Sequence, residues 1–118
     1  MNVEDGMKKL MGISGATAAM IVDSESGMIL AQAGSGFNLD LAAAGNTEVV
    51  RAKRKTMAAL KLNDRIEDML ITLGKQFHIL RPLVTKENIF IYSVLDKANA
   101  NLAMARLIIS DVESNIKF

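Results

Sequence analysis

The chain has 118 residues, and its 14 Lys and Arg against 13 Asp and Glu give a formal net charge of +1. This balance offers no general attraction for nucleic acid or for an anionic membrane surface, and a chain with no Trp and one Tyr has few platforms for stacking bases. The absence of Cys excludes disulfides, thiol catalysis and thiolate metal sites.

No apolar run approaches the roughly 20 residues of a membrane-spanning helix, and the first residues lack the core of a signal peptide. The length suits one hydrophobic core. We therefore expect a single domain over residues 1–118, located in the cytoplasm and without a membrane span.

The first half of the chain predicts a helix, a hairpin and a second helix. A short apolar stripe indicates a helix over residues 2–11, and ATAAMIVD (16–23) is apolar on both faces, as in a strand of a covered sheet. Residues 24–27 (SESG) are typical of a tight turn, so MILAQA (28–33) should return beside that strand. The longest segment without strand character, residues 38–62, predicts a helix that Asn38 or Asp40 can cap.

The second half predicts three strands and a last helix. DMLITL (68–73), QFHILRPL (76–83) and IFIYSVL (89–95) are separated by short turns, and Pro82 should lie near a strand end because it cannot donate to a ladder. After Asp96, a possible cap, the apolar residues step by three and four along the last helix. They are Ala98, Leu102, Ala105, Ile109, Val112 and Ile116.

This order predicts an α/β protein of the α+β type with a five-stranded, mostly antiparallel sheet. Short turns join all strands except across the long helix, which favours antiparallel pairing. Strands that are apolar on both faces need cover on both sides, so the long helix should cover one face and the terminal helices the other.

No residue pattern predicts catalysis or a bound cofactor. His78 is the only histidine, so a metal site would need carboxylates alone beside it, and Ser14 and Ser93 have no evident histidine–acid partners. Residues 34–36 (GSG) lack the Lys-Ser/Thr ending of a phosphate-binding loop. We therefore expect no enzyme activity, no cofactor and no metal.

A basic cluster on the long helix has two interpretations. Arg51, Lys53, Arg54 and Lys55 can form a solvated face balanced by Glu48, which is the simpler one. The alternative is a contact surface for an acidic partner. On that alternative we assign partner binding to Arg51, Arg54 and Lys55.

Several phrases resemble the roadblock/LC7 family of small dimeric adaptor and GTPase-regulating domains, in its bacterial or archaeal single-domain form. GISGA (12–16) leads into MIVD (20–23), followed by Ser26-Gly27 and ILA (29–31). The strands DMLITLG and IFIYSVLD and the helix NLAMARLIISDV are also similar to that family, so the resemblance covers nearly the whole chain.

The resemblance implies a sheet order of 2-1-5-4-3 and a homodimer or heterodimer, with third strands paired edge to edge and long helices packed antiparallel. An apolar edge strand is an aggregation hazard unless something pairs with it, which supports this expectation. The interface would include Asn46, Val49, Val50, Lys53, Met57, Met69, Leu70 and Ile71.

The resemblance also implies a small Ras-like GTPase as partner, activated or scaffolded without catalysis by this chain. Two other functions stay open. Related α/β sandwiches hold metabolites, so the chain could be a small-ligand sensory module, or it could be a structural subunit of a motor or other assembly.

Overall fold

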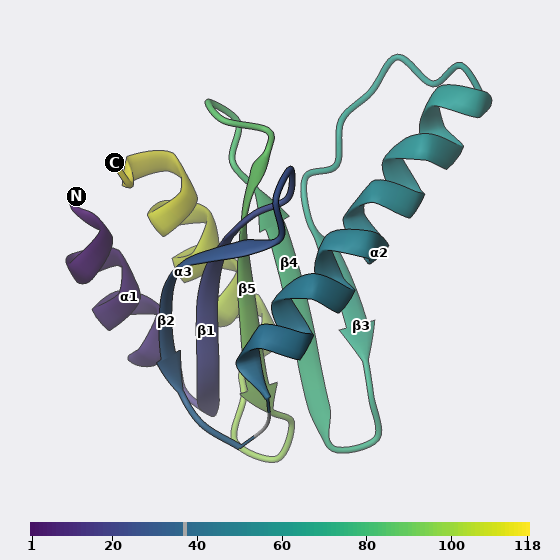
Figure 1. Ribbon diagram of the computed structural model, residues 1–118. Helices are drawn as coiled ribbons and strands as arrows, with labels where there is room; N and C mark the ends of the chain where they lie inside the picture. The colour runs from purple at the N-terminus through teal and green to yellow at the C-terminus, as the bar shows by residue number, and fades with distance from the viewer. Residues whose placement is uncertain (37) are drawn as a thin grey trace.

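A computed structural model describes residues 1–36 and 38–118 and confirms the predicted fold class and strand order. The sheet has the order β2-β1-β5-β4-β3, and every neighbouring pair is antiparallel (Figure 1). The elements are α1 (Val3–Met11), β1 (Ala16–Asp23), β2 (Met28–Gly34), α2 (Leu39–Ala59), β3 (Met69–Thr72), β4 (Gln76–Pro82), β5 (Ile89–Asp96) and α3 (Leu102–Asn115).

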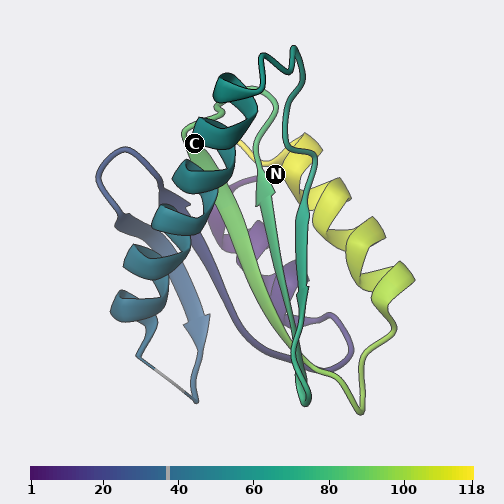
Figure 2. The same cartoon turned by 90° about the vertical axis from the view of Figure 1, so that its right-hand side faces the viewer.

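The sheet lies between two helical layers, as the apolar strands predict. The long helix α2 covers one face, and α1 and α3 share the other (Figures 1 and 2). Each face has its own core: one combines Val50 of α2 with Tyr92 of β5, and the other combines Leu10 of α1 with Ile109 of α3. β1 and β5, paired on both sides, supply residues to both cores.

The cap of α2 and the end of β4 are as predicted, but α2 ends earlier than the predicted residue 62. Asn38 caps α2, since its side chain accepts from the Leu41 N–H at 3.0 Å. The helix ends at Ala59, because Lys61 takes a left-handed conformation with φ of 57°. Pro82 is the last residue of β4, as expected.

The prediction that Asp96 caps the last helix is wrong. Asp96 ends β5, where its carboxylate accepts from the Ala98 N–H and the Asn99 side-chain amide and so closes a turn. α3 begins later, at Leu102, because the extended Asn101 caps it by accepting from the Met104 N–H. Two residues that can both cap a helix thus lie five positions apart, and the turn after β5 uses the first of them.

Candidate functional site

The outer edge of β3 is available for pairing. Among the described residues β3 pairs only with β4, in an uninterrupted register from Met69↔Leu80 to Thr72↔Phe77. The segment MLIT has no proline, no charge and no bulge, which are the devices that usually protect an edge strand. Figure 2, which views the molecule from the β3 side, shows no helix or strand lying over this edge.

The opposite edge, β2, carries such a device. The register between β1 and β2 shifts after Ile21↔Ala31, because the next pair is Val22↔Ile29 and Leu30 is left over. This β-bulge bends the strand and disrupts the row of backbone groups at its edge. Of the two edges, β3 is therefore the one suited to pairing with another chain.

One flank of α2 faces the same side of the molecule as β3. Asn46, Val49, Lys53 and Met57 follow one another at intervals of three or four residues and so share a helix face, here called the α2 flank. Arg51 points the other way, because its guanidinium donates to the Glu25 carbonyl in the β1–β2 turn. α2 packs chiefly over β1 and β2, which leaves Met69 and Ile71 of β3 only half-buried.

Val50 does not belong to this surface, contrary to our prediction. Its side chain has 0% exposure and packs under α2 with Leu80 and Tyr92. Position 50 lies one residue past Val49, and a helix turns by about 100° per residue, so the two side chains point to different sides. Val49 is 36% exposed and remains on the α2 flank.

His78 joins the α2 flank to the sheet through a row of polar groups. Its Nε2 lies 2.9 Å from Oε1 of Gln76, and its Nδ1 lies 2.9 Å from the Tyr92 hydroxyl, which also bonds the Asn46 side chain. Because an amide oxygen only accepts, the neutral ring donates from Nε2 and accepts the tyrosine proton at Nδ1. Burial lowers the pKa of His78 and raises that of Tyr92, so both stay uncharged near neutral pH.

Structural contacts already occupy two residues of the basic cluster. Arg51 donates to the Glu25 carbonyl at 2.6 Å and pairs with Glu48 at 3.2 Å, while Arg54 donates to the Glu87 carbonyl at 2.5 Å. These bonds tie the β1–β2 and β4–β5 turns to α2. Lys53 and Lys55 are exposed and form no side-chain hydrogen bond or ion pair within residues 1–36 and 38–118.

A network of charged groups holds the start of β3 against α3. Arg106 of α3 donates to both oxygens of Asp68, each at 2.9 Å, immediately before β3. Arg81 of β4 pairs with Glu113 of α3 at 3.1 Å and approaches Asp68 at 4.0 Å. The free edge is therefore positioned from the α3 side of the sheet.

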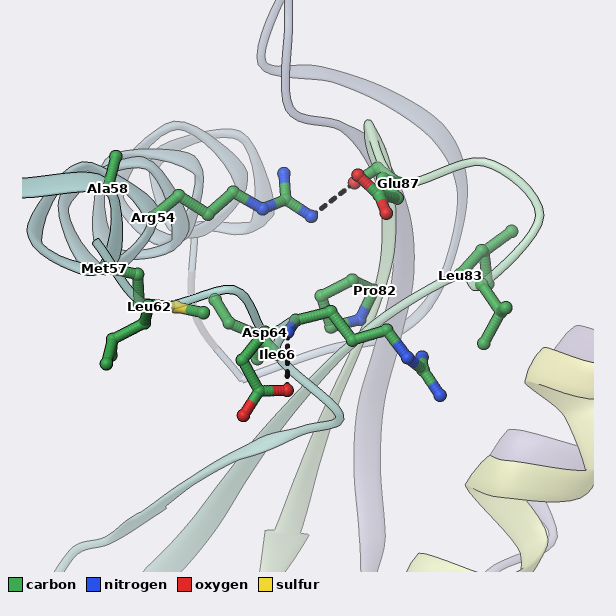
Figure 3. Close-up of a pocket in the computed structure, with 11 residues that line it drawn as sticks. Arg54, Met57, Ala58, Leu62, Asp64, Ile66, Pro82, Leu83 and Glu87 are labelled. Carbon is green, nitrogen blue, oxygen red and sulfur yellow. Dashed lines mark hydrogen bonds between the residues drawn. The ribbon is translucent and has the colours of Figure 1, made fainter. Parts of the chain in front are cut away.

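A pocket of about 210 Å³ lies under the end of α2, and we call it the α2-end pocket (Figure 3). Its apolar walls come from Met57 on α2, Leu62 and Ile66 in the following connection, Pro82 at the end of β4 and Val84 just after that strand. Sequence reasoning missed this pocket, because it forms only when residues 60–68 fold back beside the β4–β5 turn. Exposed Leu60 and Leu62 after the helix were the available signal.

The described residues show neither a metal cluster nor a membrane span. No group of three or more His, Cys, Asp or Glu side chains among them could hold a metal ion. Within the same part of the chain, no helix combines the length and apolar character needed to cross a bilayer.

No protein-family model and no curated protein sequence matches this chain. Solved structures do. A Roadblock/LC7 domain from Streptomyces avermitilis has a TM-score of 0.81 at 10% identity, over 97% of this chain and 93% of that chain. MglB of Myxococcus xanthus also has a TM-score of 0.81, at 14% identity, over 93% and 87% respectively.

A further MglB structure, described as having a tetrameric arrangement, matches with a TM-score of 0.79 at 18% identity, over 93% of this chain and 81% of that chain. At such identities the likeness shows the fold alone. It agrees with the strand order and the layers of helices described above. The chain therefore has the roadblock/LC7 fold.

Proposed function

We propose that this protein is a non-enzymatic, homodimeric regulator or scaffold of a small Ras-like GTPase. The roadblock/LC7 fold supports the proposal, together with the local phrases that resemble that family. The tetrameric arrangement described for one MglB structure is a property of that protein, and it supports self-association as a use of this fold.

The observation that carries the proposal is the unprotected edge of β3 beside a sheet face that α2 covers only in part. A second copy placed across a two-fold axis would pair its own β3 with this edge and satisfy the backbone groups. Its α2 would then bury Met69 and Ile71, which a single copy leaves half-exposed. The strand pairing and the burial of Met69 and Ile71 come from the same two-fold contact. Because each copy uses up its free edge in that contact, assembly stops at two copies.

The dimer is tested by placing a charge on the paired edge. Ile71→Glu should produce monomers in light scattering at micromolar concentration, because the carboxylate would be buried between the sheet and the α2 helix of the second copy. Leu107→Glu, at a 66% exposed position on α3, is the matched control and should leave the mass unchanged. A monomeric unmodified chain would contradict the proposal. Val50→Glu is unsuitable, because it would unfold the core of the single chain.

The GTPase role is tested with a purified small Ras-like GTPase from the same genome, loaded with GDP or with a non-hydrolysable GTP analogue. We expect binding to depend on the nucleotide, since a regulator must distinguish the two conformations. Lys55→Glu should weaken binding, while Lys75→Glu, in the distant β3–β4 turn, should not. Equal affinity for both nucleotide states would argue against regulation.

The size of the α2-end pocket bears on the alternative of a metabolite sensor. Pockets for drug-sized ligands span about 300–1,000 Å³, whereas this one is about 210 Å³. The α2-end pocket therefore suits a single side chain better than a metabolite, although a more open hollow of about 320 Å³ lies between α2 and the sheet beside Asn46, His78 and Tyr92.

A further inference from the structure

The α2-end pocket is built by one copy of the chain, none of its described lining residues belongs to β3, and Met57 is the residue that it shares with the α2 flank. Its walls come from the last turns of α2, the connection to β3, and the segment after β4 (Figure 3). Figure 1 shows this end of α2 extending beyond the sheet. Arg54 spans the pocket to the Glu87 carbonyl at 2.5 Å, so the helix and the β4–β5 turn are held at a fixed separation.

The rim of the pocket presents apolar surface to solvent. Leu62 is 52% exposed and Val84 is 49% exposed, and Leu60 just before the pocket is 64% exposed. Single exposed apolar residues are common, but these three lie beside a pocket that combines apolar walls with charged residues. Such a combination suits an inserted apolar side chain, with the rim residues covering its neighbours.

The surrounding segment is the most basic part of the chain. Residues 51–65 contain six of the 14 Lys and Arg but only one of the 13 acidic residues, so the rest of the chain carries four more negative than positive charges. Asp64 and Glu87 also line the pocket. The Asp64 carboxylate accepts from the Arg65 N–H, while the side chains of Lys61 and Arg65 form no hydrogen bond or ion pair with the described residues.

We propose that the α2-end pocket is a docking site for an acidic segment of a partner protein that inserts one large apolar side chain. The apolar walls favour a protein over nucleic acid, because none of the described residues that line the pocket is an aromatic on which bases could stack. Within the lining Arg54 and Arg65 balance Asp64 and Glu87, so the exposed Lys61 and Arg65, which pair with no described acidic group, are the cations that select acidic flanks. The inference names the chemistry of the partner surface, and it rests on the proposed function only for the existence of a protein partner.

The test uses the whole chain and a fluorescein-labelled peptide with a central phenylalanine and four acidic residues on each side. Fluorescence anisotropy should show binding that weakens at high salt. Replacing the phenylalanine by serine should weaken binding by about tenfold, the loss expected for removing one buried aromatic anchor. A peptide with lysine in place of the acidic residues, and a single-stranded oligonucleotide, should bind more weakly than the acidic peptide.

Variants of the chain locate the contact. Leu62→Glu and Arg65→Glu should each weaken binding of the acidic peptide by tenfold or more. The first removes an apolar contact, and the second removes a favourable charge. The controls are Leu107→Glu on α3 and Lys75→Glu in the β3–β4 turn, which make the same chemical changes at distant exposed positions. Both controls should keep the affinity of the unmodified chain.

Several outcomes would overturn the inference: no binding, tighter binding of the lysine peptide or the oligonucleotide, or equal loss in the control variants. The Ile71→Glu variant separates this inference from the dimer, because a pocket formed by one copy should still bind the peptide in a monomer. Absence of binding in an intact dimer would reject the pocket and leave the proposed dimer unaffected. An unmodified chain that is monomeric and still binds the peptide would reject the proposed dimer and leave the pocket inference unaffected.

Discussion

The ion pair between Arg81 and Glu113 lies between β4 and α3, where little water reaches either group. The side chains are 13% and 4% exposed, respectively. Glu113 also accepts weakly from the Val84 N–H at 3.4 Å, so the pair links the sheet, the helix and the segment that forms one wall of the α2-end pocket. Such a pair adds little net stability over apolar residues, but breaking it leaves a buried charge.

Arg81→Met should therefore destabilise the fold strongly, by about 3–5 kcal/mol in urea denaturation. The double variant Arg81→Met/Glu113→Leu should recover most of that loss, because the one buried carboxylate that remains nearby, Asp68, keeps its pair with Arg106. The exposed pair Lys9–Asp111, with side chains 53% and 50% exposed, is the control. Lys9→Met should change the free energy of unfolding by less than about 1 kcal/mol. Equal losses of unfolding free energy for Arg81→Met and Lys9→Met would contradict the claim that burial makes the Arg81–Glu113 pair costly to break.

His78 makes stability depend on pH. Burial lowers its pKa in the folded chain below the ordinary value of about 6.5, so the unfolded chain binds the proton more readily. The contribution of the neutral ring to stability is complete above pH 6.5 and is lost as the pH falls from there through the lower folded-state value. The free-energy advantage of the unmodified chain over His78→Gln should shrink over that window in urea titrations. A constant difference would show that His78 does not titrate in this way.

Within single elements, Gly34 at the end of β2 and Gly45 in the middle of α2 differ in whether the position requires a glycine. A Cβ on Gly34 would lie 2.1 Å from the Thr17 carbonyl oxygen, and the backbone has a φ of +91°. A Cβ on Gly45 would meet nothing within 4 Å. The first glycine is required by close approach of two strands, and the second only reduces helix stability.

Gly34→Ala should destabilise the chain by about 1–3 kcal/mol or more, the usual cost of overpacking, and should loosen β2. Gly45→Ala should stabilise it by roughly 0.5–1 kcal/mol through helix propensity. Thermal unfolding of the two variants under the same conditions measures both. A stabilising Gly34→Ala would mean that β1 and β2 are farther apart than described.

For the whole molecule, the absence of cysteine makes the proposed helix crossing directly measurable. We expect single cysteines at Asn46, Val49 and Lys53 to form disulfides between copies, with a maximum at the residue nearest the two-fold axis, because only there does a residue face its own equivalent. Ala44→Cys, an exposed position toward the opposite flank, is the control and should stay reduced. Uniform cross-linking at all four positions would indicate random collision.

Local patterns predicted most of the architecture. The strands 16–23 and 89–95 were recognisable because residues apolar on both faces need cover on both sides, and the turns at 24–27 and 74–75 have short-range signals. The choice of Asn101 over Asp96 as a cap was not predictable in this way. Both residues can cap, and the turn that follows β5 decides which of them does.

By itself, the sequence determined the order of the elements, their periodicity and the apolar character of β3, because these depend on neighbours within a few residues. Only the tertiary structure decided that Val50 faces inward, that Arg51 and Arg54 bind backbone carbonyls, and that a pocket forms beneath the end of α2. Each of these depends on which segments, distant along the chain, come to lie beside α2 when the sheet assembles.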